Sequence, residues 1–167
     1  MTTVVAFRPD LTMMADSRIS HGDATFRSTK KIQRVGNFLV GLAGEYGPAL
    51  NFLRQFALAA RGLDGKTPPT MPTVTDDFEM IALSSSGLWL YSSGGEPLEI
   101  EEDYYAVGTG GIYARTALRV QEMCGMPHDI HMALNVACEF DPGSALPLVE
   151  LALPKTAKPR RGAARVP

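Results

Sequence analysis

The chain has 167 residues, of which 45% are hydrophobic and 20% charged, and this is the composition of about one folded globular domain. The composition excludes disorder over the whole chain, and no apolar run approaches the roughly 20 residues that a membrane-spanning helix needs. The net charge of −2 is uneven, because the last 13 residues carry +5 and leave −7 on the first 154. We therefore expect one acidic domain over residues 1–154, without a broad nucleic-acid-binding face, and a basic flexible tail over 155–167.

The cysteine count and the N-terminus bear on the cellular compartment. Cys124 and Cys138 are too few for a disulfide framework or a four-cysteine zinc site. No basic segment followed by an apolar stretch and a cleavage site opens the chain, so no secretory signal is visible. These observations predict a protein of the reducing cytoplasm.

The first part of the chain has the pattern of antiparallel strands. Residues 2–7 and 11–15 are apolar runs on either side of a Pro-Asp turn, and 31–35 and 38–43 flank Gly36-Asn37, which favours a hairpin. The stretch 19–27 is more polar, and we expect a loop there. Each of the two hairpins predicts neighbouring strands of an antiparallel sheet.

Helical and strand patterns alternate in the rest of the chain. Apolar residues three and four apart predict a helix over 48–60, and the proline-rich stretch 64–75 can be neither helix nor central strand. We expect strands over 79–83, 88–92, 104–107 and 146–153, with helices over 112–123 and 127–140. This order predicts an α+β fold with two antiparallel sheets, in layers stacked α, β, β, α.

Thr2 is a candidate nucleophile. Methionine is readily removed before a small residue such as threonine, and this removal would make Thr2 the N-terminal residue. An N-terminal threonine carries both a hydroxyl that can attack and a free α-amine that can accept the proton. The amine has a pKa of about 7.7–8.0 when unperturbed, and a nearby ammonium would lower it. Many cytosolic proteins begin with Met-Thr, so this pair alone specifies little.

Five segments, of which the first contains Thr2, form a longer pattern. In chain order they are Thr2-Thr3-Val4-Val5, Ala15-Asp16-Ser17-Arg18, Lys30-Lys31-Ile32, Leu42-Ala43-Gly44, and Val107 to Gly111 with Tyr113-Ala114. With these segments the chain resembles the proteasome β-subunits and, still more, the HslV-type bacterial proteases. The resemblance runs in order over residues 2–153 and implies the four-layer fold of the N-terminal-nucleophile hydrolases.

The resemblance implies a set of catalytic roles. Thr2 corresponds to the nucleophile, Lys31 to the lysine that tunes it, and Asp16 to the carboxylate that holds this lysine charged. Gly44 corresponds to the residue whose backbone N–H forms the oxyanion hole. Thr109 stands where these proteins usually have a serine, and retains its hydroxyl. Asp141 and Ser144 resemble a proteasomal pair near the threonine amine, although the HslV-type sequences differ there.

The resemblance also implies a substrate and partners. The backbone of Ser20 would pair with an extended polypeptide, and Ile19, Leu42 and Tyr46 would line an apolar specificity pocket. The implied activity is threonine-type endopeptidase cleavage of unfolded polypeptides, with no cofactor and no metal. The implied assembly is a stacked homo-oligomeric ring, served by a separate ATPase because the chain has no ATP-binding motif.

The proline-rich stretch 64–75 departs from this family pattern. It replaces a second long helix, so we expect one outer helical layer to be a single helix. This departure puts in doubt ATPase docking on that surface, although it leaves the catalytic centre unaffected.

Other functions stay open at this point. The chain could form a catalytically silent ring that acts as a scaffold or cage, particularly if Met1 is retained, or it could be a small-molecule amidase of the same fold. Gly108-Thr109-Gly110-Gly111 could cradle a phosphate, but Tyr113 stands where the third glycine of a dinucleotide-binding motif belongs. His128 and His131 lie three apart without an evident third metal ligand, and Cys138 has the surroundings of a core residue.

Overall fold

The fold consists of two sheets, a separate ribbon and three helices, seen in a computed structural model that describes residues 2–21, 24–28, 30–72, 78–92 and 96–155. One sheet has the order β10-β1-β2-β11, and the other has the order β5-β6-β7-β8-β9. All of the pairings in both sheets are antiparallel. The four-stranded sheet is formed by Tyr104–Val107 (β10), Val4–Phe7 (β1), Thr12–Asp16 (β2) and Leu148–Ala152 (β11). The five-stranded sheet is formed by Ile32–Val35 (β5), Phe38–Gly44 (β6), Phe78–Leu83 (β7), Leu88–Tyr91 (β8) and Leu98–Glu99 (β9).

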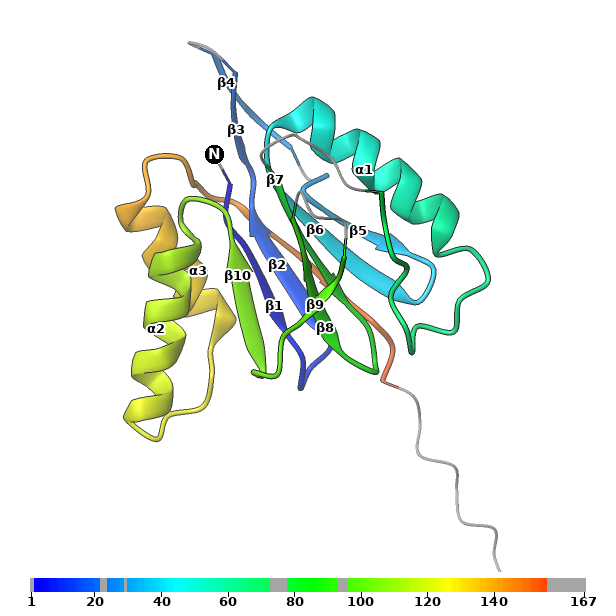
Figure 1. Ribbon diagram of the computed structural model, residues 1–167. Coiled ribbons are helices and arrows are strands. Elements are labelled where there is room, and N and C mark those ends of the chain that lie inside the picture. Colours follow the sequence, from blue (N-terminus) through cyan, green and yellow to red (C-terminus); the bar gives the residue numbers. More distant parts are fainter. Residues whose placement is uncertain (1, 22–23, 29, 73–77, 93–95, 156–167) are drawn as a thin grey trace, which may run out of the picture.

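The two sheets face each other, and helices cover their outer sides (Figure 1). A core cluster between the sheets contains alternate residues of the facing strands, such as Val4, Met13 and Ile81. A second cluster lies between the five-stranded sheet and Tyr46–Ala59 (α1), and a third lies between the four-stranded sheet and the pair Gly111–Met123 (α2) and Ile130–Phe140 (α3). The predicted four-layer α-β-β-α architecture is therefore confirmed.

The outer helical layer over the five-stranded sheet is thin. In the described residues α1 is the one helix on this side, whereas α2 and α3 together cover the other sheet. Residues 64–72 contain no helix or strand, and Met71 packs into the cluster under α1. The first nine residues of the proline-rich stretch thus continue the cover over this sheet, while 73–75 lie outside the described residues.

One sequence-based expectation about local structure is wrong. Residues 19–27 were expected to form a loop, but Arg18–His21 (β3) and Ala24–Arg27 (β4) pair as an antiparallel ribbon separate from both sheets. Its register places Ile19 opposite Phe26. Every residue of β4 is exposed, so this strand buries no face and lacks the apolar alternation by which strands are recognised.

The remaining differences concern short or terminal segments. The two-residue strand β9 was not predicted, because a strand so short shows no periodicity. Helix α3 begins at Ile130 and not at residue 127, because the Asp129 carboxylate accepts a hydrogen bond from the Met132 N–H at 2.9 Å and so caps the helix. The predicted boundary between the domain and the basic tail stays a prediction, and residues 156–167 lie outside the described residues.

Candidate active site

A buried carboxylate is the centre of the candidate site. Asp16 ends β2, and its Oδ1 accepts hydrogen bonds from Lys31 Nζ at 2.7 Å and from the Thr3 N–H at 2.8 Å. Its Oδ2 accepts from the N–H groups of Arg18 at 2.9 Å and Ala145 at 3.1 Å. Four donors from four segments of the chain therefore satisfy a side chain that is fully excluded from solvent.

The predicted pairing of Asp16 with Lys31 is thus present. Burial of this pair changes the pKa of the lysine. The side chain of Lys31 is 5% exposed, and that of Asp16 is not exposed. Removal from solvent lowers the pKa of Lys31 below its ordinary value of 10.5, and this effect exceeds the opposing attraction of the Asp16 carboxylate. Lys31 therefore releases its proton more readily than a surface lysine.

Thr2 lies beside this ion pair through its neighbour in the chain. The N–H of Thr3 donates to the Asp16 carboxylate, and the Thr3 C=O accepts from the Asp16 N–H at 3.1 Å. Thr2 itself is 8% exposed. A Cβ on Gly108 would overlap the Thr2 carbonyl oxygen, so only a glycine allows this close approach of the two segments. The position of Thr2 is therefore fixed on both sides by backbone contacts.

A chain of hydrogen-bonded side chains leads away from Thr3. Its hydroxyl lies 2.6 Å from the hydroxyl of Ser144, and Ser144 donates to Asp141 Oδ2 at 2.7 Å. The Thr109 hydroxyl donates to the same oxygen at 2.8 Å. A Cβ on Gly110 would overlap the Thr3 hydroxyl. The predicted residues Thr109, Asp141 and Ser144 are therefore brought together next to the start of β1.

The predicted substrate-binding residues are spread over three elements. Gly44 ends β6 and is exposed, whereas Leu42 is 8% exposed and packs in the cluster under α1. Ile19 is half-buried in β3, and the backbone of Ser20 pairs opposite Thr25. Tyr46 begins α1, and the side chains of Ser20 and Tyr46 are outside the described set. The apolar specificity pocket and the oxyanion role of Gly44 stay predictions.

The histidines and the cysteine that the sequence offered as other candidate sites pack against protein groups. His128 makes edge contacts with the rings of Phe7 and Tyr104, and His131 Nε2 lies 3.6 Å from Glu150 Oε2. Within the described part of the chain, no three potential metal-ligating side chains come together. Cys138 is half-buried, and burial raises the pKa of its thiol to about 11.

Several residues of the site were not found from the sequence. Arg18 and Ala145 contribute only backbone N–H groups to Asp16, and any residue type except proline can do this. Thr3 is indistinguishable in the sequence from an ordinary strand residue. The clearest available signal was Glu79, a charged residue within the apolar run of β7, whose carboxylate accepts from the Gly108 N–H at 3.2 Å.

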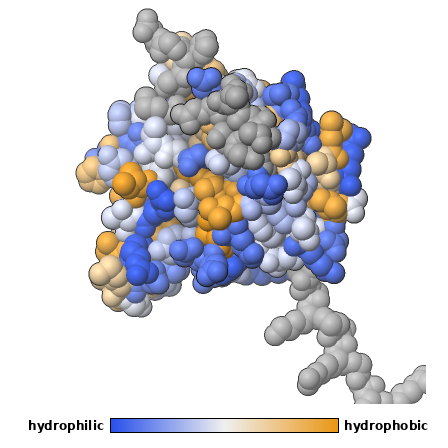
Figure 2. Space-filling model, in the orientation of Figure 1, coloured by the Kyte–Doolittle hydropathy of each residue, from blue (hydrophilic) through white to orange (hydrophobic). Residues whose placement is uncertain are grey.

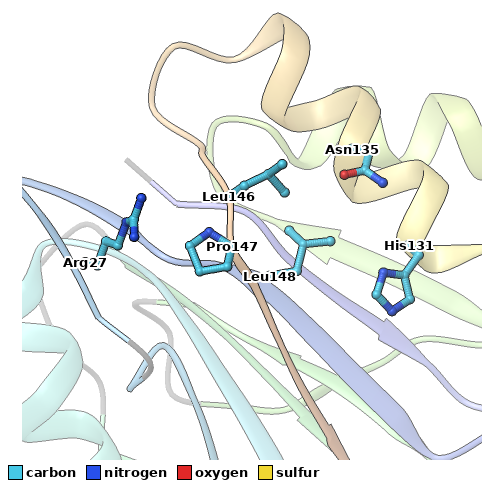
Figure 3. A pocket seen from close by; sticks show the side chains of 6 residues that line it. All are labelled: Arg27, His131, Asn135, Leu146, Pro147 and Leu148. Carbon is cyan, nitrogen blue, oxygen red and sulfur yellow. The ribbon is translucent and has the colours of Figure 1, made fainter.

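A surface pocket lies beside the site and not within it. It has a volume of about 430 Å³ and is lined by Arg27, His131, Asn135, Leu146, Pro147 and Leu148 (Figure 3). None of the predicted site residues lines it. The segment Leu146 to Leu148 forms one wall and directly follows Ala145, so the pocket borders the backbone that holds Asp16.

Comparison with solved structures identifies the fold of the chain. Two solved structures share the fold: Thiobacillus denitrificans BPH in complex with epoxomicin (TM-score 0.67, 19% identity, 91% of this chain and 98% of that one) and eukaryotic HslV from Trypanosoma brucei (TM-score 0.68, 17% identity, 90% and 98%). The fold is therefore that of the N-terminal-nucleophile hydrolases.

Relatives found by sequence comparison are protease subunits named HslV. The ATP-dependent protease subunit HslV of Treponema denticola is 26% identical over 129 residues, covering 68% of this chain and 72% of that protein. The HslV subunit of Caldanaerobacter subterraneus is 27% identical over 133 residues, covering 70% and 76%. No protein-family model matches the chain. The resemblance to HslV-type threonine proteases that the sequence carries is confirmed by these relatives.

Proposed function

We propose that the protein is a threonine endopeptidase that cleaves polypeptides with Thr2 after Met1 has been removed. The observation that supports this function most directly is the buried Asp16–Lys31 pair, whose carboxylate also holds the residue next to Thr2. The relatives named as ATP-dependent protease subunits support the same activity. The structure with bound epoxomicin belongs to a protein of the same fold.

The first chemical step is attack by the Thr2 hydroxyl on a peptide carbonyl. The oxygen of Thr2 forms a bond to the carbonyl carbon, and its proton passes to the free α-amine of the same residue. The amine must be neutral to accept this proton. Lys31 and the Thr3 N–H both donate to Asp16, and the ammonium form of Lys31 at this place favours the neutral amine of the neighbouring Thr2 by charge repulsion.

The second step releases the amine product. The tetrahedral oxyanion is stabilised by a backbone N–H at Gly44, and the α-ammonium of Thr2 returns its proton to the leaving nitrogen. The C–N bond breaks, and an ester links the acyl group to Thr2. Water then hydrolyses this ester and restores the free hydroxyl, so the overall reaction consumes one peptide bond and one water.

The hydroxyl chain beyond Thr3 has a supporting role in this proposal. Ser144 and Asp141 hold the Thr3 side chain, and Thr109 donates to the same carboxylate. These contacts hold Thr3, which links Thr2 to β1, so that Thr2 does not have to be ordered at the moment of reaction.

We further propose that the protein works as a stacked homo-oligomeric ring with a separate ATPase. The relatives are named as subunits of an ATP-dependent protease, which supports an ATPase partner. None of the helices in the described ranges is long and apolar enough to cross a membrane. The cytoplasmic location stays a prediction from the sequence.

The decisive experiment is the intact mass of the purified protein before and after an epoxyketone or β-lactone probe. We expect loss of the Met1 mass and one probe adduct. Thr2→Ala should lose Met1 equally well, because alanine is also a small second residue, but should form no adduct. Thr25→Ala, in the exposed ribbon strand β4, is the matched control and should be labelled as the wild type is.

Two results would contradict the proposal. Retention of Met1 without an adduct would favour the silent ring, because an amide nitrogen cannot accept the proton. An adduct on Thr2 combined with turnover of small amides, but of no peptide in a library of varied length and sequence, would favour the amidase.

A further inference from the structure

Glu79 occupies a position in β7 where a packing role would demand an apolar side chain. Ile81 and Leu83 of the same strand are fully buried between the two sheets. Phe78 and Met80 face the cluster under α1 on the opposite side. Because side chains alternate along a strand, Glu79 shares the face of Ile81 and Leu83 and is half-buried there. Charged residues are rare at such positions unless they have a polar partner.

The partner of Glu79 is a backbone group of the other sheet. The N–H of Gly108, in the loop that follows β10, donates to Glu79 Oε2 at 3.2 Å. Ala43 is the cross-strand neighbour of Glu79, and a Cβ on Gly108 would lie 3.2 Å from the Cβ of Ala43. The two sheets therefore meet at this point without room for a further side chain, and the Glu79 carboxylate connects them.

This connection lies between two parts of the candidate active site. Gly108 abuts the carbonyl oxygen of Thr2, which precedes the four-stranded sheet. Ala43 precedes Gly44, at the end of β6 in the five-stranded sheet. Gly108 thus lies against Thr2 on one side and against Ala43, the neighbour of Gly44 in the chain, on the other. The Asp16–Lys31 pair joins the same two sheets a second time, since Lys31 directly precedes β5.

We propose that Glu79 is a positioning residue of the active site, whose carboxylate holds Gly108 and thereby fixes the separation of Thr2 from the Gly44 N–H. The inference rests on the proposed function. An oxyanion donor is effective only at about 2.7–3.1 Å from the developing charge, so a small displacement of one sheet against the other weakens stabilisation of the transition state. Ground-state binding of the peptide depends less on this separation.

Three variants distinguish the role of Glu79 as a hydrogen-bond acceptor from the role of its negative charge. Glu79→Gln retains a carbonyl oxygen at the same reach, Glu79→Asp retains the charge on a side chain one methylene shorter, and Glu79→Leu removes both. We expect kcat for a peptide substrate to fall about tenfold in the Asp and Leu variants, with KM changed less than about twofold. The Gln variant should stay within about threefold of the wild type. The midpoints of the pH profile should not move, because Asp16 and Lys31 are untouched.

The control is Glu139→Leu, which removes an exposed glutamate of α3. This variant should retain wild-type kcat and KM. Hydrogen exchange at the Gly108 amide gives a readout that needs no activity, and it can be measured in the inactive Thr2→Ala protein. Exchange should accelerate at least about tenfold when Glu79→Asp is added, and less than about threefold when Glu79→Gln is added.

The results distinguish this inference from the proposed function. If the wild-type protein shows no Thr2-dependent hydrolysis, the proposed function fails, and the exchange rates alone decide whether Glu79 holds Gly108. If the wild type is active, wild-type kcat in both the Asp and Leu variants would overturn the inference. Equal losses of kcat in the Gln and Leu variants would also overturn it, because Gln keeps the acceptor.

Discussion

The hydroxyl of Thr3 connects the start of β1 to Ser144, and its loss should reduce catalysis without unfolding the protein. Thr3→Val preserves the shape of the side chain but leaves Ser144 without this contact, whereas Thr3→Ser keeps the hydroxyl. We expect Thr3→Val to lower kcat about tenfold and to cost about 1–3 kcal/mol of unfolding free energy, because a buried polar contact is lost. Peptide kinetics and urea unfolding measure both effects.

Thr3→Ser separates the role of the hydroxyl from that of the methyl group. It should recover most of kcat, although it leaves a small cavity. Thr25→Val, in the exposed β4, is the control for replacing a strand threonine and should change neither quantity. Equal kinetics in Thr3→Val and the wild type would show that the hydroxyl chain does not position Thr2.

The lowered pKa of Lys31 predicts how stability depends on pH. Burial favours the neutral lysine in the folded protein, so the unfolded chain binds more protons between the lowered pKa and 10.5. The free energy of unfolding contributed by this group therefore rises with pH through that window, by at most about 1.4 kcal/mol per pH unit. Urea unfolding at several pH values should show a smaller rise in Lys31→Met than in the wild type.

Removal of the Asp16 charge should lower the Lys31 pKa further. Both the hydrogen bond and the charge of Asp16 raise this pKa, so Asp16→Asn leaves the effect of burial opposed only by the weaker influence of Cys138 and Asp141. We expect NMR titration of the lysine side chain to give a lower midpoint in the folded variant than in the wild type. An unchanged or higher midpoint would mean that the carboxylate does not favour the charged lysine.

At the scale of elements, the turn between β10 and α2 is a tight contact that requires glycine. Gly110 directly precedes α2, and a Cβ there would overlap the Thr3 hydroxyl. We expect Gly110→Ala to destabilise the fold by about 1–3 kcal/mol and to lower labelling of Thr2 by an epoxyketone. The matched control is Gly47→Ala in the first turn of α1, where nothing lies within 4 Å of an added Cβ.

The two glycine variants should change the stability of the protein in opposite directions. Alanine at position 47 should leave labelling unchanged and stabilise the protein slightly, because alanine favours a helix over glycine. A thermal midpoint of Gly110→Ala equal to that of Gly47→Ala would contradict the argument that the loop and the start of β1 are in close contact.

Elements that contact the core were predictable from the sequence, and elements that do not were missed. The helix α1 follows from apolar residues such as Phe52 and Phe56, which are buried against the five-stranded sheet. Strand β4 of the separate ribbon has no buried face, so its residues show no periodicity. In the site, the side chains Asp16 and Lys31 were predictable from their motifs. The backbone donors of Arg18 and Ala145 were not, because tertiary structure alone brings them to Asp16.

At the scale of the whole molecule, exposed arginines among the described residues lie near one sheet edge together with Glu150 of β11, and exposed glutamates lie at the other edge. At one edge β11 contacts β5, with Arg27 beside the pocket and Arg34 exposed on β5. At the other edge Glu99, Glu101 and Glu102 are exposed on β9 and the segment after it. Figure 2 shows apolar surface between β10 and β9, with hydrophilic residues around it. Different surfaces that complement each other allow head-to-tail contacts, which can close into a ring.

The proposed ring predicts a charge-dependent association of subunits. Arg27→Glu with Arg34→Glu should reduce the assembled fraction, and so should Glu101→Lys with Glu102→Lys. Mixing the two double variants should restore assembly, because each reversed edge then meets the opposite charge. Native mass spectrometry of the separate and mixed variants measures this. Full assembly of each variant by itself would contradict contact through these edges.

The four donors to Asp16 also determine at which stage of synthesis and folding the candidate site is complete. They come from residues 3, 18, 31 and 145, so they span nearly the whole folded domain. A nascent chain that has not yet released residue 145 from the ribosome cannot complete this set, and contacts so distant in the sequence form slowly. A partly synthesised or partly folded subunit therefore lacks the complete candidate site, and the proposed peptidase activity begins only when the domain is complete.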